Sequence, residues 1–102
     1  MKPPTSFSKI VDRKRYSVET STLIAHDAYW DGHNFERHGR NSFLYRTPKG
    51  AYFTVTLTQW QEEHDSLRPV TQDEAIELYE NALSEHEVSY HLSFPGVDVL
   101  DA

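Results

Sequence analysis

Residues 42–57 constrain the fold most strongly, because a clear turn signal lies between two alternating segments. Pro48 fits the second position of a type I turn, and Gly50 accepts the left-handed conformation that follows it. A three-residue loop of Pro48, Lys49 and Gly50 fixes the register of a hairpin. One face then pairs mainly apolar residues, namely Thr47 with Ala51, Tyr45 with Phe53, and Phe43 with Val55, with Leu57 on the same side. The other face is predicted to be solvated, and pairs Arg46 with Tyr52, Leu44 with Thr54, and Ser42 with Thr56.

The cover for the apolar face is predicted to be a helix over residues 71–84. Thr71 and Glu74 have the spacing of a capping box, and acidic residues favour the positive end of the helix dipole. An apolar stripe recurs at helical spacing and consists of Ala75, Ile76, Tyr79, Ala82 and Leu83. Each large member of the stripe contributes about 1.5–3 kcal/mol when buried, which exceeds what exposed charges add.

Four other segments are assigned from alternation and composition. Residues 9–16 predict either a minimal hairpin or an edge segment. Residues 20–30 favour a strand, and the alternative of one helical turn just before it stays open. Residues 31–41 are polar and glycine-containing and predict a loop, whereas the alternation in residues 88–94 predicts a strand at the sheet edge.

These elements predict one α+β domain spanning residues 1–102, with a small antiparallel β-sheet of three to five strands and one amphipathic α-helix packed on one face. A chain of 102 residues buries one core. We expect an ordered body over about residues 9–94 and flexible ends at residues 1–8 and 95–102. The absence of cysteine excludes a disulfide framework and a thiolate nucleophile. With neither a signal peptide nor a run of about 20 apolar residues, we expect a cytoplasmic protein without membrane contact.

Charge is distributed unevenly along the chain, although the net charge is only −6. Residues 1–50 contain nine Lys or Arg and five Asp or Glu, whereas residues 51–102 contain one and eleven. A basic first half could contact phosphates, and an acidic second half could attract a basic partner. This asymmetry is the strongest global signal for function in the sequence.

Three stretches together resemble a group of small uncharacterised bacterial proteins that are often carried on phages and other mobile elements. They are Lys14–Tyr16 with Glu19–Ala25, Leu44–Phe53, and Pro69–Ala75. The Leu-Tyr-Arg-Thr-x-Lys-Gly hairpin, followed by a Pro-x-Thr-capped helix, is the most specific part. The chain departs from the group where an Asn-Gly turn is expected, since it has Asp12-Arg13 there. The resemblance implies a host-manipulating or element-maintenance protein and supplies no catalytic residues.

The histidines offer the main candidates for chemistry. A loop with Asp31, His33, Glu36 and His38 holds potential metal ligands, but its spacing matches no familiar site and its composition is typical of a solvated loop.

A second candidate combines His26 and Asp27 as a base with a hydroxyl of Ser42 or Thr54, although no motif orders these groups. The four glycines form no phosphate-binding cluster. We predict no metal site, no cofactor and no enzyme activity.

The favoured function is a non-catalytic protein-interaction module with an acidic face, which docks onto a basic, nucleic-acid-handling host protein. The residues of this face are Asp73, Glu74, Glu77, Glu80 and Glu85. The alternative is a nucleic-acid-binding accessory protein that uses a basic edge, with Tyr52 as a stacking platform. The residues of that edge are Arg13, Lys14, Arg15, Arg46 and Tyr52.

A homodimer is a further alternative, in which basic and acidic halves meet and residues 88–94 pair edge to edge. Trp30 and Trp60 are predicted to be either interface anchors or core residues.

Overall fold

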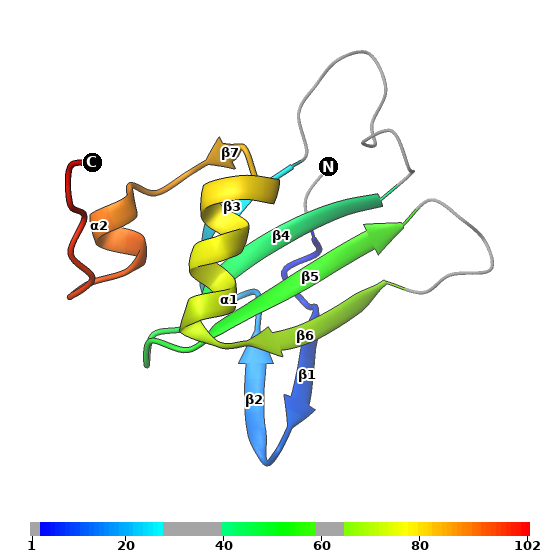
Figure 1. Ribbon diagram of the computed structural model, residues 1–102. Coiled ribbons are helices and arrows are strands. Elements are labelled where there is room, and N and C mark those ends of the chain that lie inside the picture. The colour runs from blue at the N-terminus through cyan, green and yellow to red at the C-terminus, as the bar shows by residue number, and fades with distance from the viewer. Residues whose placement is uncertain (1–2, 28–39, 59–64) are drawn as a thin grey trace.

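The computed structural model describes residues 3–27, 40–58 and 65–102 (Figure 1). Its main element is an antiparallel sheet with the strand order β6-β5-β4-β3-β7. These strands are β3 (Thr22–His26), β4 (Arg40–Arg46), β5 (Tyr52–Thr58), β6 (Ser66–Val70) and β7 (Glu85–His86).

A separate hairpin consists of β1 (Ser8–Val11) and β2 (Lys14–Ser17). The helical segments are α1 (Gln72–Glu77), which continues into the π-helix η1 (Leu78–Ala82), and α2 (Tyr90–Ser93). The predicted α+β class, a small antiparallel sheet with a helix packed on one face, is confirmed.

The β4–β5 hairpin has the predicted register, with Tyr45 opposite Phe53 and Phe43 opposite Val55. The N–H of Thr47 donates to the carbonyl of Ala51 at 2.8 Å and closes the pair of strands. Gly50 has a φ of +88°, the left-handed conformation that its position in the loop requires. The turn residues therefore set the register of the sheet centre, as the sequence indicates.

The first hairpin is also present, and a two-residue turn closes it. Val11 pairs with Lys14, and the two residues between them, Asp12 and Arg13, have positive φ angles of 52° and 64°. This is the backbone shape of the turns that match the right-handed twist of paired strands. Asp12 and Arg13 thus adopt the conformation that Asn-Gly would adopt more easily.

The prediction that the helix covers the Phe43 face of the β4–β5 hairpin is wrong, because the β1–β2 hairpin covers that face. Tyr16 and Val18 from the first hairpin region pack against it. The Tyr16 ring meets the Phe53 ring edge-on, with centroids 5.7 Å apart. The sheet side chains of this cluster are Phe43, Tyr45, Phe53, Val55, Leu57 and Leu67.

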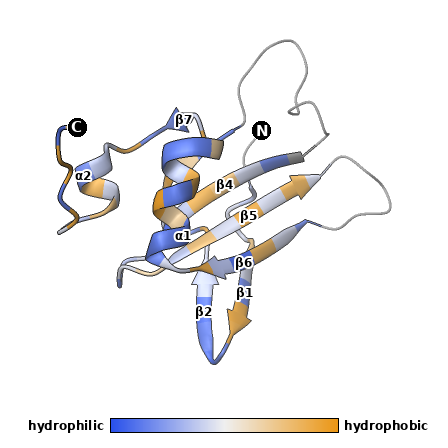
Figure 2. Ribbon diagram, viewed as in Figure 1, coloured by the Kyte–Doolittle hydropathy of each residue, from blue (hydrophilic) through white to orange (hydrophobic). Residues whose placement is uncertain are grey.

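The helix covers the opposite face, which the alternation predicts to be solvated. Leu44, Tyr52 and Thr54 are buried there, and the Tyr52 hydroxyl donates to the carbonyl of Ser93 at 2.6 Å. The helical side contributes Ala75, Tyr79, Leu83 and Phe94. In Figure 2 the helix alternates between hydrophilic and hydrophobic residues, as expected of an amphipathic helix. Both faces of the sheet are therefore covered, by different elements (Figure 1).

Four local predictions require correction. Residues 88–94 do not form an edge strand, because Tyr90–Ser93 is helical and the short edge strand is Glu85–His86. The pairing of two copies through residues 88–94 is wrong for the same reason. Asn41 belongs to β4 and is fully buried, not part of a solvated loop. Ala82 belongs to the predicted apolar stripe but is exposed, because the π-helical turn rotates the end of the helix.

The capping box at the start of α1 is confirmed and supports the first stability prediction. The Glu74 N–H donates to Thr71 Oγ1 at 3.1 Å, and the Thr71 N–H donates to Glu74 Oε1 at 3.0 Å. Thr71→Ala is expected to lower the free energy of unfolding by about 1 kcal/mol. Urea unfolding followed by circular dichroism measures this, with Gln72→Ala at the next position as the control. Equal stability of the two variants would contradict a role for the cap.

Candidate protein-interaction surface

The acidic layer, defined as residues 72–102, lies mainly on the helix-covered side of the sheet. It contains eight Asp or Glu residues and no Lys or Arg. The five predicted residues of this surface differ in their surroundings. Asp73 and Glu77 on α1 and Glu85 on β7 are exposed, and their carboxylates have no hydrogen bond or ion pair within the described part of the chain. These three carboxylates are therefore available to a partner.

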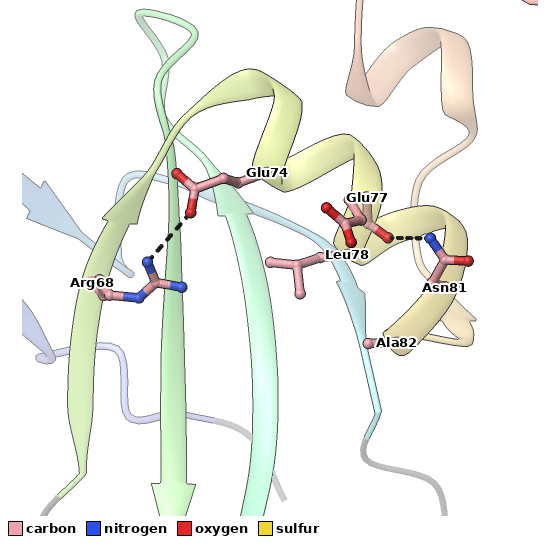
Figure 3. Close-up of a pocket in the computed structure, with 6 residues that line it drawn as sticks. All are labelled: Arg68, Glu74, Glu77, Leu78, Asn81 and Ala82. Carbon is pink, nitrogen blue, oxygen red and sulfur yellow. Dashed lines mark hydrogen bonds and ion pairs between the residues drawn. The ribbon is translucent and has the colours of Figure 1, made fainter.

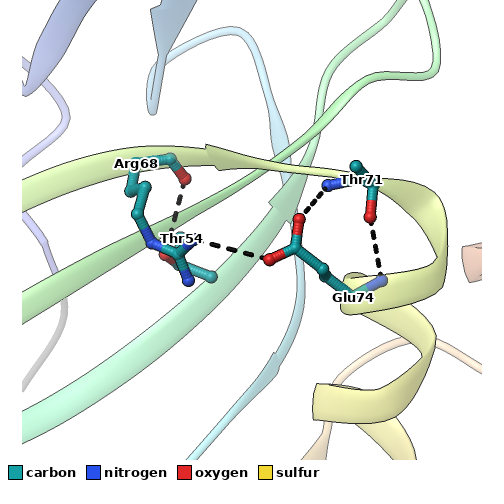
Figure 4. A network of polar contacts seen from close by, with 4 residues as sticks. All are labelled: Thr54, Arg68, Thr71 and Glu74. Atoms are coloured by element: carbon teal, nitrogen blue, oxygen red, sulfur yellow. Dashed lines mark hydrogen bonds and ion pairs between the residues drawn. The ribbon is translucent and has the colours of Figure 1, made fainter.

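Glu74, in contrast, is already bound within the molecule (Figure 4). Besides its two bonds with Thr71, its Oε2 lies 3.5 Å from Nη1 of Arg68 on β6. The hydrogen bonds from the Thr71 backbone and side chain, with Arg68 nearby, lower the pKa of the Glu74 carboxyl. Glu74 thus caps the N-terminus of α1 and contacts β6, and its carboxylate is not free for a partner.

Arg68 is a residue of this surface that the sequence reasoning missed. It is the only Lys or Arg in residues 51–102, and this isolation was the signal that could have singled it out. Its backbone carbonyl accepts a 3.5 Å hydrogen bond from Thr54 Oγ1, which ties β6 to β5 (Figure 4). Arg68 on β6 thus lies beside Glu74 of α1, at the edge of the acidic layer.

A hollow of about 230 Å³ lies between α1 and β6 (Figure 3). The side chains of Arg68, Glu74 and Glu77 converge on it from two elements, and its remaining wall consists of Leu78, Asn81 and Ala82. A second hollow of about 160 Å³ shares Arg68 and Leu78 with the first. Its other lining residues are mostly hydroxyl-bearing: Ser42, Thr54, Thr56, Ser66 and Leu83. Two adjoining hollows, lined by charged, hydroxyl-bearing and aliphatic side chains, therefore lie along the edge of the helix.

Glu80 is held by the contacts around η1. The N–H of Leu83 donates to the carbonyl of Leu78 at 2.9 Å, the five-residue spacing of a π-helix. The Tyr79 carbonyl accepts from Nε2 of His86 at 2.7 Å, and the two rings stack with centroids 3.8 Å apart. On the next residue, Glu80 Oε2 accepts a 2.8 Å hydrogen bond from the Tyr90 hydroxyl. This hydrogen bond thus ties Glu80 of η1 to α2.

The predicted basic edge is not one surface. Arg13 in the turn and Lys14 and Arg15 on β2 are exposed on the first hairpin. Arg46 alternates with Tyr45, which packs toward that hairpin, so Arg46 projects from the opposite face of the sheet. Its Nε is buried without a hydrogen-bond partner in the described segments.

The prediction that Tyr52 is a stacking platform also requires correction, because the residue is 5% exposed and its ring centroid lies 5.3 Å from that of Phe94. It is a core residue and offers no face for stacking against a base.

The candidate base and hydroxyl are placed close together, but their polar groups are engaged elsewhere. Asp27 Oδ1 accepts from the backbone N–H of Ser42 at 2.8 Å, so it braces the start of β4. The His26 ring stacks on the Phe43 ring, with centroids 5.6 Å apart. Its Nε2 lies 3.7 Å from Glu87 Oε2. Thr54 bonds to the Arg68 carbonyl. This arrangement supports strand pairing and does not align a base with a hydroxyl.

The predicted ligand loop (Asp31, His33, Glu36, His38) and both tryptophans lie outside the described residues. Within residues 3–27, 40–58 and 65–102, no group of three or more His, Asp or Glu side chains is arranged to hold a metal ion. Over the same residues, no helix has the length and apolar character needed to cross a membrane. Comparisons with protein-family models, curated proteins and solved structures gave no match to this chain.

Proposed function

We propose that this protein is a non-catalytic interaction module that acts in the cytoplasm and docks its acidic layer onto a basic, nucleic-acid-handling protein. The carrying observation is the separation of charge onto different elements. The acidic layer has no Lys or Arg, whereas residues 8–17 of the first hairpin have four and only one Asp. The two elements pack against opposite faces of the sheet.

The chemistry of the layer supports a basic protein as the partner. Asp73 and Glu77 are one helical turn apart, so their carboxylates project from neighbouring positions on α1. Carboxylates at such spacing can stand where the phosphates of a nucleic acid would meet Lys and Arg side chains. The resemblance to proteins of phages and mobile elements supports a nucleic-acid-handling protein of the host as the target.

Charge reversal at one exposed position tests the proposal. Glu77→Lys is expected to reduce retention of the basic partner roughly fivefold or more, because it replaces an attraction with a repulsion. The control is Glu19→Lys, which makes the same change of charge at an exposed residue outside the acidic layer. The measurement is quantitative mass spectrometry of proteins retained from bacterial lysate at low salt, with and without nuclease. Equal retention by both variants would contradict the proposal.

Nucleic-acid binding by the first hairpin is the second candidate. The turn places Arg13 at the tip, and Arg13, Lys14 and Arg15 have no ion pair with any described residue. Recovery of nucleic acid in the same experiment, lost when these three residues are replaced by alanine, would favour this candidate. Steep weakening with salt would accompany it, because each phosphate contact releases counterions.

A further inference from the structure

A groove of about 430 Å³ separates η1 from α2 and the C-terminal segment. It is lined by Glu80, Tyr90, His91, Asp98, Val99 and Leu100. The hydrogen bond from the Tyr90 hydroxyl to Glu80 joins η1 to α2 at this groove and, with burial, raises the pKa of Tyr90. His91 faces the same groove, and no hydrogen bond or ion pair joins it to a carboxylate of the described residues.

Exposed apolar side chains form part of the groove lining. Four large hydrophobic side chains of the described segments are strongly exposed, and two of them, Val99 and Leu100, belong to this groove. Leu100 is 86% exposed and Val99 is 58% exposed, and both line the groove. Leaving such side chains in water forfeits the free energy that burial would supply. Neighbouring exposed apolar side chains that are bordered by polar residues suit an interaction site.

The charge of the rim selects the kind of partner. Glu80 and Asp98 line the groove, and no Lys or Arg occurs anywhere in residues 69–102. An acidic partner or a nucleic acid would therefore be repelled. A segment that carries both apolar and cationic side chains matches the exposed Val99 and Leu100 and the acidic residues of this groove together.

We propose that this groove receives an apolar anchor side chain of the partner, flanked by Lys or Arg residues that contact Glu80 and Asp98. The inference rests on the proposed function and narrows the partner to a cationic amphipathic segment. Apolar anchors in pockets dominate the binding energy of many interfaces, while charged rims set specificity and association rate. The exposed carboxylates of α1 then guide the approach, and the groove holds the segment in place.

The test uses two synthetic peptides of equal length and charge, one built of Lys and Leu at helical spacing and the other of Lys and Ser. Binding to the full chain is measured by fluorescence anisotropy at low salt. We expect the Lys/Leu peptide to bind more tightly, and Leu100→Ser to weaken it about tenfold, as expected for loss of one apolar contact. Leu92→Ser is the matched control, because Leu92 is 70% exposed but does not line the groove.

Each other result overturns the inference in a distinguishable way. If Leu100→Ser binds like the unmodified chain while Glu77→Lys still weakens both peptides, the acidic layer functions without the groove. If neither peptide binds, both the groove and the proposed function are wrong. If the unmodified chain sediments as a dimer and Leu100→Ser as a monomer, a second copy occupies the groove. Both leucines are exposed, so these variants are expected to fold normally.

Discussion

Replacement of Phe94 by alanine is expected to lower the free energy of unfolding by about 3–5 kcal/mol, which is a large share of the stability of a small domain. Phe94 is 0% exposed. The centroid of its ring lies 5.3 Å from that of Tyr52, 5.4 Å from that of Tyr79 and 5.2 Å from that of Tyr90. Phe94 therefore joins the sheet to both helical segments. Truncation leaves a cavity that these rings cannot close without moving.

Urea unfolding followed by circular dichroism measures the effect of Phe94→Ala. The control is Leu92→Ala, two residues earlier, where the side chain is 70% exposed and a change within about 0.5 kcal/mol is expected. If both variants lose the same small amount of stability, the C-terminal segment does not belong to the core. That result would also remove one wall of the proposed groove.

Alkaline pH is expected to destabilise the protein through Tyr45. Burial raises the pKa of the Tyr45 hydroxyl from 10.0 to about 12, because the charged phenolate loses its hydration. The folded state therefore favours the neutral phenol. The resulting contribution to the free energy of unfolding is fully present below pH 10. It is lost as pH rises from 10 towards 12, at a cost on the order of 2 kcal/mol.

Tyr45→Phe separates this effect from the other tyrosines, since the pKa values of Tyr79 and Tyr90 are also raised. The variant is expected to lose less stability than the unmodified chain between pH 10 and 12. Urea unfolding at several pH values in this range provides the measurement, and tyrosinate absorbance shows when the hydroxyls ionise. Parallel decline of both proteins would contradict a role for the Tyr45 hydroxyl.

The sequence predicted those parts of the fold that local geometry decides. Pro48 and Gly50 determine a loop length, and loop length determines register, so the pairing of Tyr45 with Phe53 followed. Thr71 and Glu74 satisfy each other's backbone groups over three residues, so the helix start was also predictable. The acidic positions on the helix followed from the same periodicity, although the binding of Glu74 by Arg68 did not.

The sequence did not show which element covers which face. Alternation suggested that one face of the β4–β5 hairpin is solvated, but Leu44 and Tyr52 on that face are both buried. Tyr52 is compatible with either environment, because its ring can be buried while its hydroxyl finds a partner, here the Ser93 carbonyl. That partner is 41 residues away, and such a contact leaves no local pattern.

The segment 88–94 was misassigned for a related reason. Val88, Tyr90, Leu92 and Phe94 alternate as in a strand, yet Tyr90 and Phe94 also have the spacing of one helical turn. In the structure Tyr90–Ser93 is helical, and Phe94 packs against the distant Tyr52. The groove beside α2 was consequently invisible in the sequence.

The positions of the two charged elements make the net charge of −6 a poor guide to how the molecule meets its surroundings. The first hairpin packs on one side of the sheet and the helices on the other, and packed β-layers lie about 10 Å apart. Salt screens charges beyond about 8 Å at physiological ionic strength. The electrostatic potential that acts on an approaching molecule therefore comes mainly from the charges on the nearer side. Each side of the domain therefore presents its own charge to an approaching molecule, and the net charge describes neither side.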